Sequence, residues 1–417
     1  MRDIASPPTI IPVSGPTIAI SGVSFGWGSA GKLSAVIAAL RRRLPELHLV
    51  GIGTELGRPV LAGLGVRDWY EGPLDDVLLP AFLHEQVVSC ALVILDPDTA
   101  DALSAVGCPT VFVDSLPFLW TSSDPIPSEV AVYCAQICSN LPPPSWEPIS
   151  RIGNLSWVEA IVPPRPHRVD ARSSRRAVVN FGGLHSPQNP AGNPTYLRYL
   201  LAPTIDALIC RNYSEIAICG NIGEAELPPI GAAGVRITSG RYQHESFLAL
   251  VEQAGILVTS PGLTTLLEGS SMCTPTVCLP PQNISQVFNS ERFAQVVSPY
   301  CRVSWPRQVL DLAALHQVRL DGEAAALAAM SDALGSRSPE AWHAEFTERI
   351  VAAIDATRHV PSWSALTDQA GVDGADQVAD AVVETVAGTR GAPMAGPGQR
   401  ARSPRLRLAE HGHALGR

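Results

Sequence analysis

The sequence lacks the features that mark several classes of protein. No apolar run is long enough to cross a membrane, and the proline-rich start has no basic segment ahead of an apolar one, so we expect no signal peptide. The nine cysteines include no CxxC pair, which favours reduced thiols and disfavours a zinc site. The net charge of −9 is opposite to the basic excess of proteins that bind nucleic acids. We therefore expect a cytoplasmic protein that holds no metal and binds neither membranes nor nucleic acids.

Lysine is also nearly absent. Of the 30 basic residues, 29 are arginine, and Lys32 is the only lysine. In a GC-rich genome lysine codons drift to arginine wherever either cation serves, which would make Lys32 a chance survivor. Alternatively, the position needs a compact ammonium group rather than a planar guanidinium. Because Lys32 lies in a glycine-rich loop, we favour a functional role.

Strand-like and helix-like segments alternate along the chain of 417 residues, which is long enough for two domains. Buried strands are expected at 16–23, 47–53, 90–97 and 109–115, with a helix at 32–43. The same alternation returns with strands at 177–183, 215–220, 255–260 and 275–280 and helices at 195–209, 242–254, 308–333 and 339–357. This pattern predicts an α/β fold with two Rossmann-like, doubly wound domains that face a central cleft.

These segments divide the chain into four parts. The N-terminal domain spans residues 16–160, a proline-rich linker spans 161–176, and the C-terminal domain spans 177–360. Residues 362–417 are rich in Gly, Ala, Pro and Arg and have few large apolar side chains. Because such a segment cannot bury a core, we expect this tail to be disordered.

The segment FGWGSAGKLS follows the first expected strand and fits three kinds of phosphate-binding loop. Gly26, Gly31 and Lys32 have the spacing of a P-loop, but Leu33 stands where a P-loop needs Ser or Thr for Mg²⁺. Gly26, Gly28 and Gly31 have the spacing of a dinucleotide fingerprint, but no acidic residue closes the second strand. We therefore interpret the segment as a glycine-rich turn that forms the N-domain wall of the cleft and lets a substrate phosphate approach closely.

The most informative stretch is LVTSPGLTTLLEGSSMCTPTVCLPPQNISQVFNSERF, residues 257–293. A strand ends there at a Pro-Gly turn, after which Leu263, Thr264 and Thr265 begin a helix. The N–H groups at a helix start favour a pyrophosphate. Glu268 lies one turn further along the same face, where its carboxylate can accept hydrogen bonds from ribose hydroxyls.

This stretch resembles the donor-binding signature of the GT-B glycosyltransferase superfamily, in which a glycine-rich turn leads to a helix with a glutamate, a strand, and a loop with Gln and Asn. The residues that match this order are Gly262, Thr264, Thr265, Glu268, Pro275, Pro280, Gln286 and Asn289. The turn FGGLHSP, with Gly183 and His185, matches the start of the family's C-terminal domain. The resemblance covers most of residues 16–357 in architecture but only about three short segments in sequence.

The resemblance implies a GT-B fold and an enzyme that transfers a sugar from a nucleotide sugar, a UDP-sugar, to a small acceptor held by the N-terminal domain. The nucleotide sugar is a co-substrate, and no cofactor is implied. In the family the glutamate binds the ribose and the helix start binds the diphosphate, which assigns these roles to Glu268 and to Gly262–Thr265. Gln286 and Asn289 would bond the sugar hydroxyls, although Ser285 replaces the aspartate that usually precedes the glutamine.

The general base that would deprotonate the acceptor is not where many relatives have it, because Trp27 occupies the loop in which they carry a histidine. Asp114, at a strand end, is our first candidate for the base, and a turn-forming role is its alternative. His185 is the second candidate, and it could instead bind a donor phosphate. Lys32 could pair with the carboxylate of an anionic donor sugar.

A narrower similarity concerns the segments VDSLPFLW and VYCAQ, which look like those of cytosylglucuronate synthases in nucleoside-antibiotic biosynthesis. That similarity implies UDP-glucuronate as the donor and cytosine or a hydroxymethyl derivative as the acceptor. Three other functions stay open. They are a nucleotide-sugar epimerase of the same fold, a non-catalytic sugar-nucleotide binder, and an NAD-dependent oxidoreductase if the Gly26–Gly31 loop is a dinucleotide fingerprint.

Overall fold

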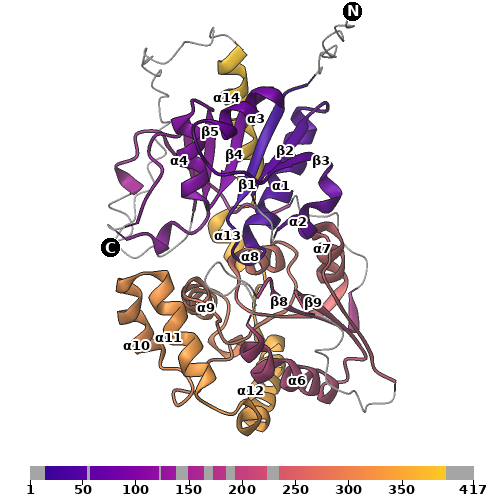
Figure 1. Ribbon diagram of the computed structural model, residues 1–417. Helices are drawn as coiled ribbons and strands as arrows, with labels where there is room; N and C mark the ends of the chain where they lie inside the picture. Colours follow the sequence, from indigo (N-terminus) through magenta and orange to yellow (C-terminus); the bar gives the residue numbers. More distant parts are fainter. Residues whose placement is uncertain are drawn as a thin grey trace, which may run out of the picture.

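The computed structural model describes residues 15–53, 57–121, 124–137, 149–163, 172–184, 193–222 and 234–390. Two parallel β-sheets, each packed between helices, make up an N-terminal and a C-terminal domain that meet at the middle of the molecule (Figure 1). The α/β class and the two doubly wound domains predicted from the sequence are confirmed.

Seven parallel strands form the N-terminal sheet, in the order β3-β2-β1-β4-β5-β6-β7. Their bounds are β1 Thr17–Gly22, β2 His48–Ile52, β3 Val66–Tyr70, β4 Val88–Ile94, β5 Thr110–Asp114, β6 Val132–Gln136 and β7 Leu155–Val158. The helices are α1 Gly28–Arg43, α2 Arg58–Leu61, α3 Leu78–Glu85 and α4 Pro97–Ala105, with 3-10 turns η1 Ala62–Leu64 and η2 Pro117–Leu119. Because both faces of the sheet are covered, β1 is buried throughout: Ile18 and Ile20 face one core and Ala19 faces the other.

Five parallel strands form the C-terminal sheet, in the order β10-β9-β8-β11-β12. Their bounds are β8 Ser173–Gly182, β9 Glu215–Gly220, β10 Arg236–Gly240, β11 Ala254–Thr259 and β12 Thr276–Cys278. The helices are α6 Pro194–Cys210, α7 His244–Gln253, α8 Leu263–Ser271, α9 Ile284–Val296, α10 Leu312–Val318, α11 Glu323–Gly335 and α12 His343–Ala356. The shorter turns are η4 Pro299–Cys301, η5 Arg319–Asp321, η6 Pro339–Trp342 and η7 Thr357–His359. Edge-to-face contacts of Trp305 with Tyr199 and Phe346, at centroid distances of 5.4 and 5.6 Å, anchor α6 and α12 on one face of this sheet.

Every strand expected from the sequence is present, and β3, β6, β7 and β10 are additional. β3 and β7 form the two edges of the N-terminal sheet, where exposed polar residues interrupt the apolar pattern. The single helix expected at 308–333 is divided into α10 and α11, because Gly322 has a φ of 101° that only glycine adopts without strain. Of the predicted linker, residues 164–171 lie outside the described residues, and 173–176 already belong to β8.

The prediction of a disordered tail from residue 362 is wrong for residues 365–390. Two helices lie there, α13 Ala365–Ala370 and α14 Gly374–Arg390, and α14 returns to pack on the N-terminal domain (Figure 1). Val378, Val382 and Val386 recur every four residues and are buried against α1 and the N-terminal sheet. The composition of the segment did not indicate this row of buried valines, because the side chains are small. Residues 391–417 lie outside the described residues.

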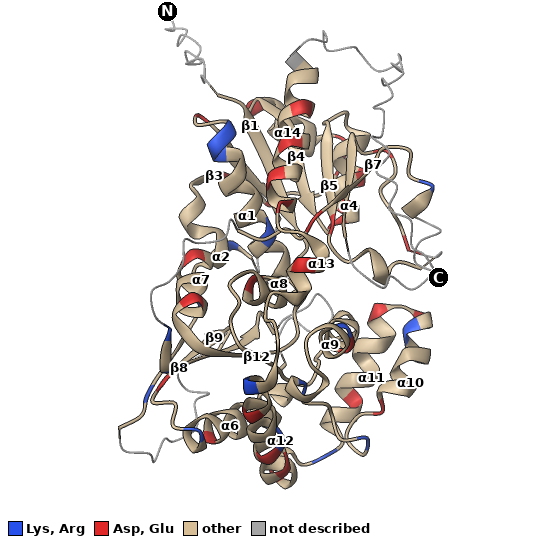
Figure 2. Ribbon diagram, turned by 180° about the vertical axis from the view of Figure 1, so that it is seen from behind, with Lys and Arg blue, Asp and Glu red and all other residues tan. Residues whose placement is uncertain are grey.

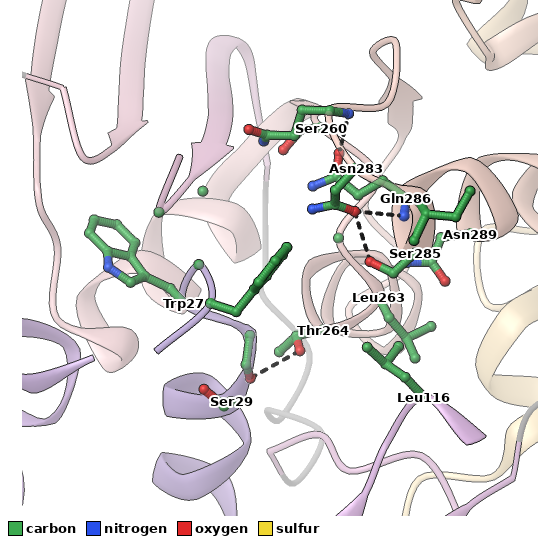
Figure 3. A pocket seen from close by; sticks show the side chains of 18 of the residues that line it. Trp27, Ser29, Leu116, Ser260, Leu263, Thr264, Asn283, Ser285, Gln286 and Asn289 are labelled. Carbon is green, nitrogen blue, oxygen red and sulfur yellow. Dashed lines mark hydrogen bonds between the residues drawn. The ribbon is translucent and has the colours of Figure 1, made fainter. Parts of the chain in front are cut away.

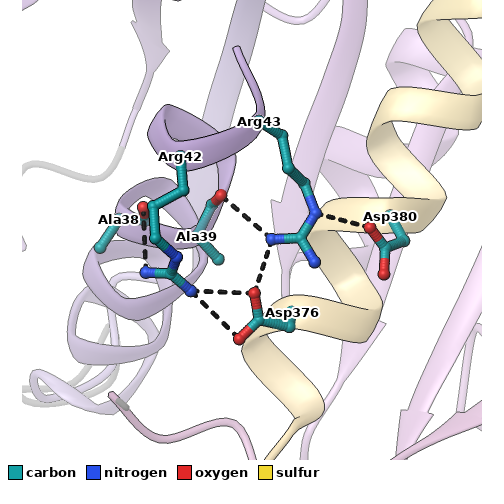
Figure 4. A network of polar contacts seen from close by, with 6 residues as sticks. All are labelled: Ala38, Ala39, Arg42, Arg43, Asp376 and Asp380. Atoms are coloured by element: carbon teal, nitrogen blue, oxygen red, sulfur yellow. Dashed lines mark hydrogen bonds and ion pairs between the residues drawn. The ribbon is translucent and has the colours of Figure 1, made fainter. Parts of the chain in front are cut away.

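Two arginines at the end of α1 hold the returning helix (Figure 4). The carboxylate of Asp376 accepts from Arg42 at 2.9 Å and from Arg43 at 2.6 Å, and Asp380 also accepts from Arg43, at 2.5 Å. Acidic residues lie along α14 in Figure 2, so α14 complements the basic end of α1. Each exposed pair contributes little by itself, typically about 0–1 kcal/mol, and the buried valines contribute more. None of the described helices has the length and apolarity to span a membrane.

We expect Val382→Ala to lower the free energy of unfolding by about 1–3 kcal/mol, because it removes two buried methyl groups and leaves a cavity. Urea denaturation followed by circular dichroism measures this change. Glu384→Ala, an exposed position on the same helix, is the control and should stay within about 0.5 kcal/mol of the wild type. Equal stability of the two variants would show that α14 does not pack against the N-terminal domain in solution.

Candidate functional site

A cavity of about 720 Å³ lies between the two domains. The segments that follow β1, β4 and β5 line it from the N-terminal domain, and the segments that follow β8, β11 and β12, with α8, α9 and α11, line it from the C-terminal domain. Figure 3 shows side chains from both domains around it. Parallel α/β sheets bind ligands outside the carboxyl ends of their strands, so this cavity is the candidate site.

The glycine-rich loop lies in the N-domain wall of the cavity, with Gly26, Gly28 and Gly31 all lining it. Gly26 has a φ of 59°, and α1 begins two residues later, at Gly28. No side chain caps the start of α1, and no acidic residue lies in its first turn. The positive end of the helix dipole therefore points into the cavity, and the first turn of α1 holds no carboxylate to neutralise it.

The C-domain wall repeats this arrangement with α8. Gly262 is the N-cap residue of α8 and makes no side-chain cap, and Leu263, Thr264 and Thr265 line the cavity. The Thr264 hydroxyl donates to the backbone carbonyl of Gly28, at 3.2 Å, so the starts of α8 and α1 touch. Two helix starts with unneutralised dipoles thus converge on one cavity.

The domains can approach this closely only because glycines stand at the contact. A Cβ atom on Gly183 would lie 2.7 Å from the Cα of Gly26, which is closer than real Cβ contacts. A Cβ atom on Gly31 would lie 3.2 Å from the side chain of Thr264. The glycines therefore serve the contact between the domains.

Lys32 lies one turn inside α1, at the edge of the cavity, and only 2% of it is exposed. Its Nζ donates to Gln136 Oε1 at 2.9 Å, and the same oxygen accepts from the backbone N–H of Ile161 at 3.2 Å. Gln136 ends β6, and Ile161 follows β7. Lys32 is thus a buried cation that ties α1 to the far edge of the sheet as well as lining the cavity.

Glu268 lies one turn inside α8 and lines the cavity, with 2% of the residue exposed. Its Oε1 is 2.6 Å from Nε2 of His244, the first residue of α7. No sequence motif marks His244 as a site residue. The available signal was its position four residues after the end of β10, at the carboxyl edge of the sheet, where ligand-binding residues gather.

Gln286 and Asn289 also line the cavity, from α9. Asn283 caps α9 and accepts from the Gln286 N–H at 3.0 Å and from the Ser285 hydroxyl at 2.8 Å (Figure 3). Gln286 Oε1 accepts from the N–H of Gln282 at 3.1 Å, and Asn289 Nδ2 donates to the carbonyl of Pro261 at 3.0 Å. Each amide therefore has one end fixed by the protein.

Asp114 lies beneath the cavity wall and is fully buried. Oδ1 accepts from the N–H of Leu116 at 2.9 Å, and Oδ2 accepts from Trp120 Nε1 at 2.6 Å and from the Tyr133 hydroxyl at 2.9 Å. Burial raises the pKa of Asp114 to about 6, against the effect of these three donors. Asp114 does not itself line the cavity, but it holds the indole of Trp120 and the backbone of Leu116, which do. His185, the other candidate base, lies outside the described residues.

Two charged residues of the C-terminal domain, Arg319 and Glu323, also line the cavity and were missed from the sequence. Burial raises the pKa of Glu323 to about 7, opposed by Arg319 and reinforced by Asp124 of the N-terminal domain. Arg319 stacks on Phe288, with its guanidinium carbon 4.5 Å from the ring centroid. No short-range motif marks these residues, because the fold of α10 and α11 brings them to the cleft. Among the described residues, no group of three or more His, Cys, Asp or Glu is placed to hold a metal ion.

Known structures share this architecture. UGT89C1 from Arabidopsis thaliana superposes with a TM-score of 0.52 at 12% identity, covering 89% of this chain and 100% of that chain. A UDP-glucosyltransferase from Polygonum tinctorium (TM-score 0.47, 12% identity, 90% of this chain and 100% of that one) and a putative UDP-N-acetylglucosamine 2-epimerase from Listeria monocytogenes (0.49, 10%, 89% and 95%) are also similar. No family model and no curated protein matches the sequence. The chain has the GT-B fold that the sequence led us to expect.

We expect Gly183→Ala to separate the domains, because its Cβ would collide with the Gly26 backbone and such overpacking costs roughly 1–3 kcal/mol. Small-angle X-ray scattering should then give a larger radius of gyration than for the wild type. Gly153→Ala is the matched control, since a Cβ there meets nothing within 4 Å. An unchanged scattering profile for Gly183→Ala would show that the domains do not touch at this point in solution.

We expect the stability advantage of the wild type over Asp114→Asn to shrink as the pH rises from about 4 to about 7. Because burial raises the pKa of Asp114 to about 6, above its usual 3.8, its protonated form stabilises the fold. That contribution is complete below pH 3.8 and is lost as the pH rises through about 6. Urea denaturation of both proteins across this range measures it. An advantage that grows with pH would mean that the three donors outweigh burial.

Proposed function

We propose that this protein is a glycosyltransferase that uses a nucleotide sugar, with the donor held in the cavity between the domains. The convergence of the starts of α1 and α8 on that cavity, with Glu268 one turn behind, is the observation that carries the proposal. The diphosphate of such a donor carries negative charge, and its leaving group gains more as the glycosidic bond breaks. Two uncapped helix starts are suited to hold that charge.

The remaining parts of the donor fit the surrounding residues. Glu268 supplies carboxylate oxygen to the ribose, and Gln286 and Asn289 supply amide groups to the sugar hydroxyls. Because one end of each amide is fixed by the protein, Gln286 Nε2 and Asn289 Oδ1 are the atoms offered to the sugar. The departing diphosphate is stabilised by the helix starts, and we propose that no metal is required.

The acceptor is proposed to bind on the N-terminal side, near Trp120 and the segment after β5. A general base for the acceptor has to be a group that reaches the cavity. Asp114 is buried, and its proposed role is to hold Trp120 in place. At the finer level we propose UDP-glucuronate as the donor and cytosine or a hydroxymethyl derivative as the acceptor. The similarity of the segments 113–120 and 132–136 to cytosylglucuronate synthases supports this choice, as does the buried cation Lys32 beside the cavity.

The first experiment is thermal stabilisation by UDP, UDP-glucose, UDP-glucuronate, UDP-N-acetylglucosamine and NAD, followed by mass spectrometry of products with cytosine added. A UDP-glucuronate response with a cytosine conjugate would support the finer proposal. Stabilisation by another UDP-sugar without a cytosine conjugate would still support a transferase, but it would exclude cytosine as the acceptor. Conversion of the donor to its epimer would favour an epimerase, and a response to NAD alone would favour an oxidoreductase.

We expect Glu268→Ala to weaken UDP binding by about 1.5–3 kcal/mol, the scale of a hydrogen bond to a charged group. Isothermal titration calorimetry measures the affinity, and Glu348→Ala, at an exposed position on α12, is the control. An unchanged affinity of Glu268→Ala for UDP would show that the nucleotide does not bind in this part of the cavity.

A further inference from the structure

The buried pair of His244 and Glu268 has a consequence for nucleotide recognition. Both side chains are nearly closed to solvent, with 8% of the histidine and 2% of the glutamate exposed, and Nε2 and Oε1 are 2.6 Å apart. His244 begins α7 and Glu268 lies in α8, so two helices fix the geometry. A carboxylate that binds a vicinal diol symmetrically turns one oxygen to each hydroxyl. Here the protein already engages one of the two oxygens.

The N-terminal domain closes the other side of the pair. A Cβ atom on Gly31 would lie 3.5 Å from His244 Nε2, so the backbone of α1 stands directly beside the imidazole. The same atom would lie 3.2 Å from Thr264, one turn before Glu268. The α1 backbone therefore limits outward movement of His244 while the domains are in contact, and Glu268, only 2% exposed, has little surface left for a ligand.

We propose that His244 is a positioning residue that restricts Glu268 to one ribose hydroxyl, so that the site also accepts a nucleoside diphosphate lacking the other hydroxyl. The inference rests on the proposed function and deepens it, because it extends the donor class to one series of monodeoxy nucleotides. The Nε2–H of His244 donates to Oε1, and Oε2 accepts from the ligand.

The test compares the affinities of UDP, 2′-deoxy-UDP and 3′-deoxy-UDP for the full-length protein by isothermal titration calorimetry. One deoxy analogue should bind within about threefold of UDP. The other should bind about 10- to 150-fold more weakly, the factor that corresponds to one hydrogen bond to a carboxylate. Equal losses for both analogues, or no loss for either, would overturn the inference.

Two substitutions of His244 then separate positioning from simple packing. His244→Gln keeps an N–H donor at a similar reach, so the difference between the two analogues should persist. His244→Ala releases the carboxylate, so the affinities of the two analogues should converge to within about threefold while UDP still binds. An unchanged difference in His244→Ala would refute the positioning role.

A matched control is available on the surface, where Nε2 of His343 lies 2.8 Å from the Asp206 carboxylate. His343→Ala removes a comparable pair outside the cavity and should leave all three affinities unchanged. Failure of UDP to bind the wild type would overturn the proposed function, and this inference with it. UDP binding with symmetric losses would overturn the inference alone.

Discussion

The architecture of the site depends on one close approach of two backbones. Gly183 lies against Gly26, and the carbonyl of Gly28 accepts from Thr264, so the domains meet where α1 and α8 begin. Ordinary side chains at these glycines would hold the domains apart. With the domains apart, the cavity would have one helix start rather than two, and His244 would lose the α1 backbone beside it.

The electrostatics of the cavity follow from that approach. The walls near the helix starts carry no acidic residue in the first turns, so the helix dipoles are not neutralised there. The carboxylates that line the cavity stand further off, on α8, in the segment after β5 and on α11. The cavity therefore offers two positive helix ends, which suit a diphosphate, and carboxylates elsewhere in its walls, which suit hydroxyls.

Buried polar groups hold the walls in place. Lys32 joins α1 to β6 through Gln136, and Asp114 joins β5 to β6 and to the indole of Trp120. The returning helix α14 packs on the same α1 whose start faces the cavity. Because buried polar contacts and packed valines tolerate little movement, the first helix is held along its whole length.

The sequence by itself determined the two doubly wound sheets, because strands buried on both faces are continuous apolar runs that alternate with helices. It also located the glycine-rich loop and the helix start at Gly262–Thr265, since such loops have local signatures. Tertiary structure alone decided the contact of α1 with α8, the pairing of His244 with Glu268, and the burial of Asp114. Those features join residues that are far apart in the chain, and each side chain's role depends on what the other domain places beside it. The helix α14 escaped detection for a related reason: its small valines and alanines become a core only against α1 and the sheet.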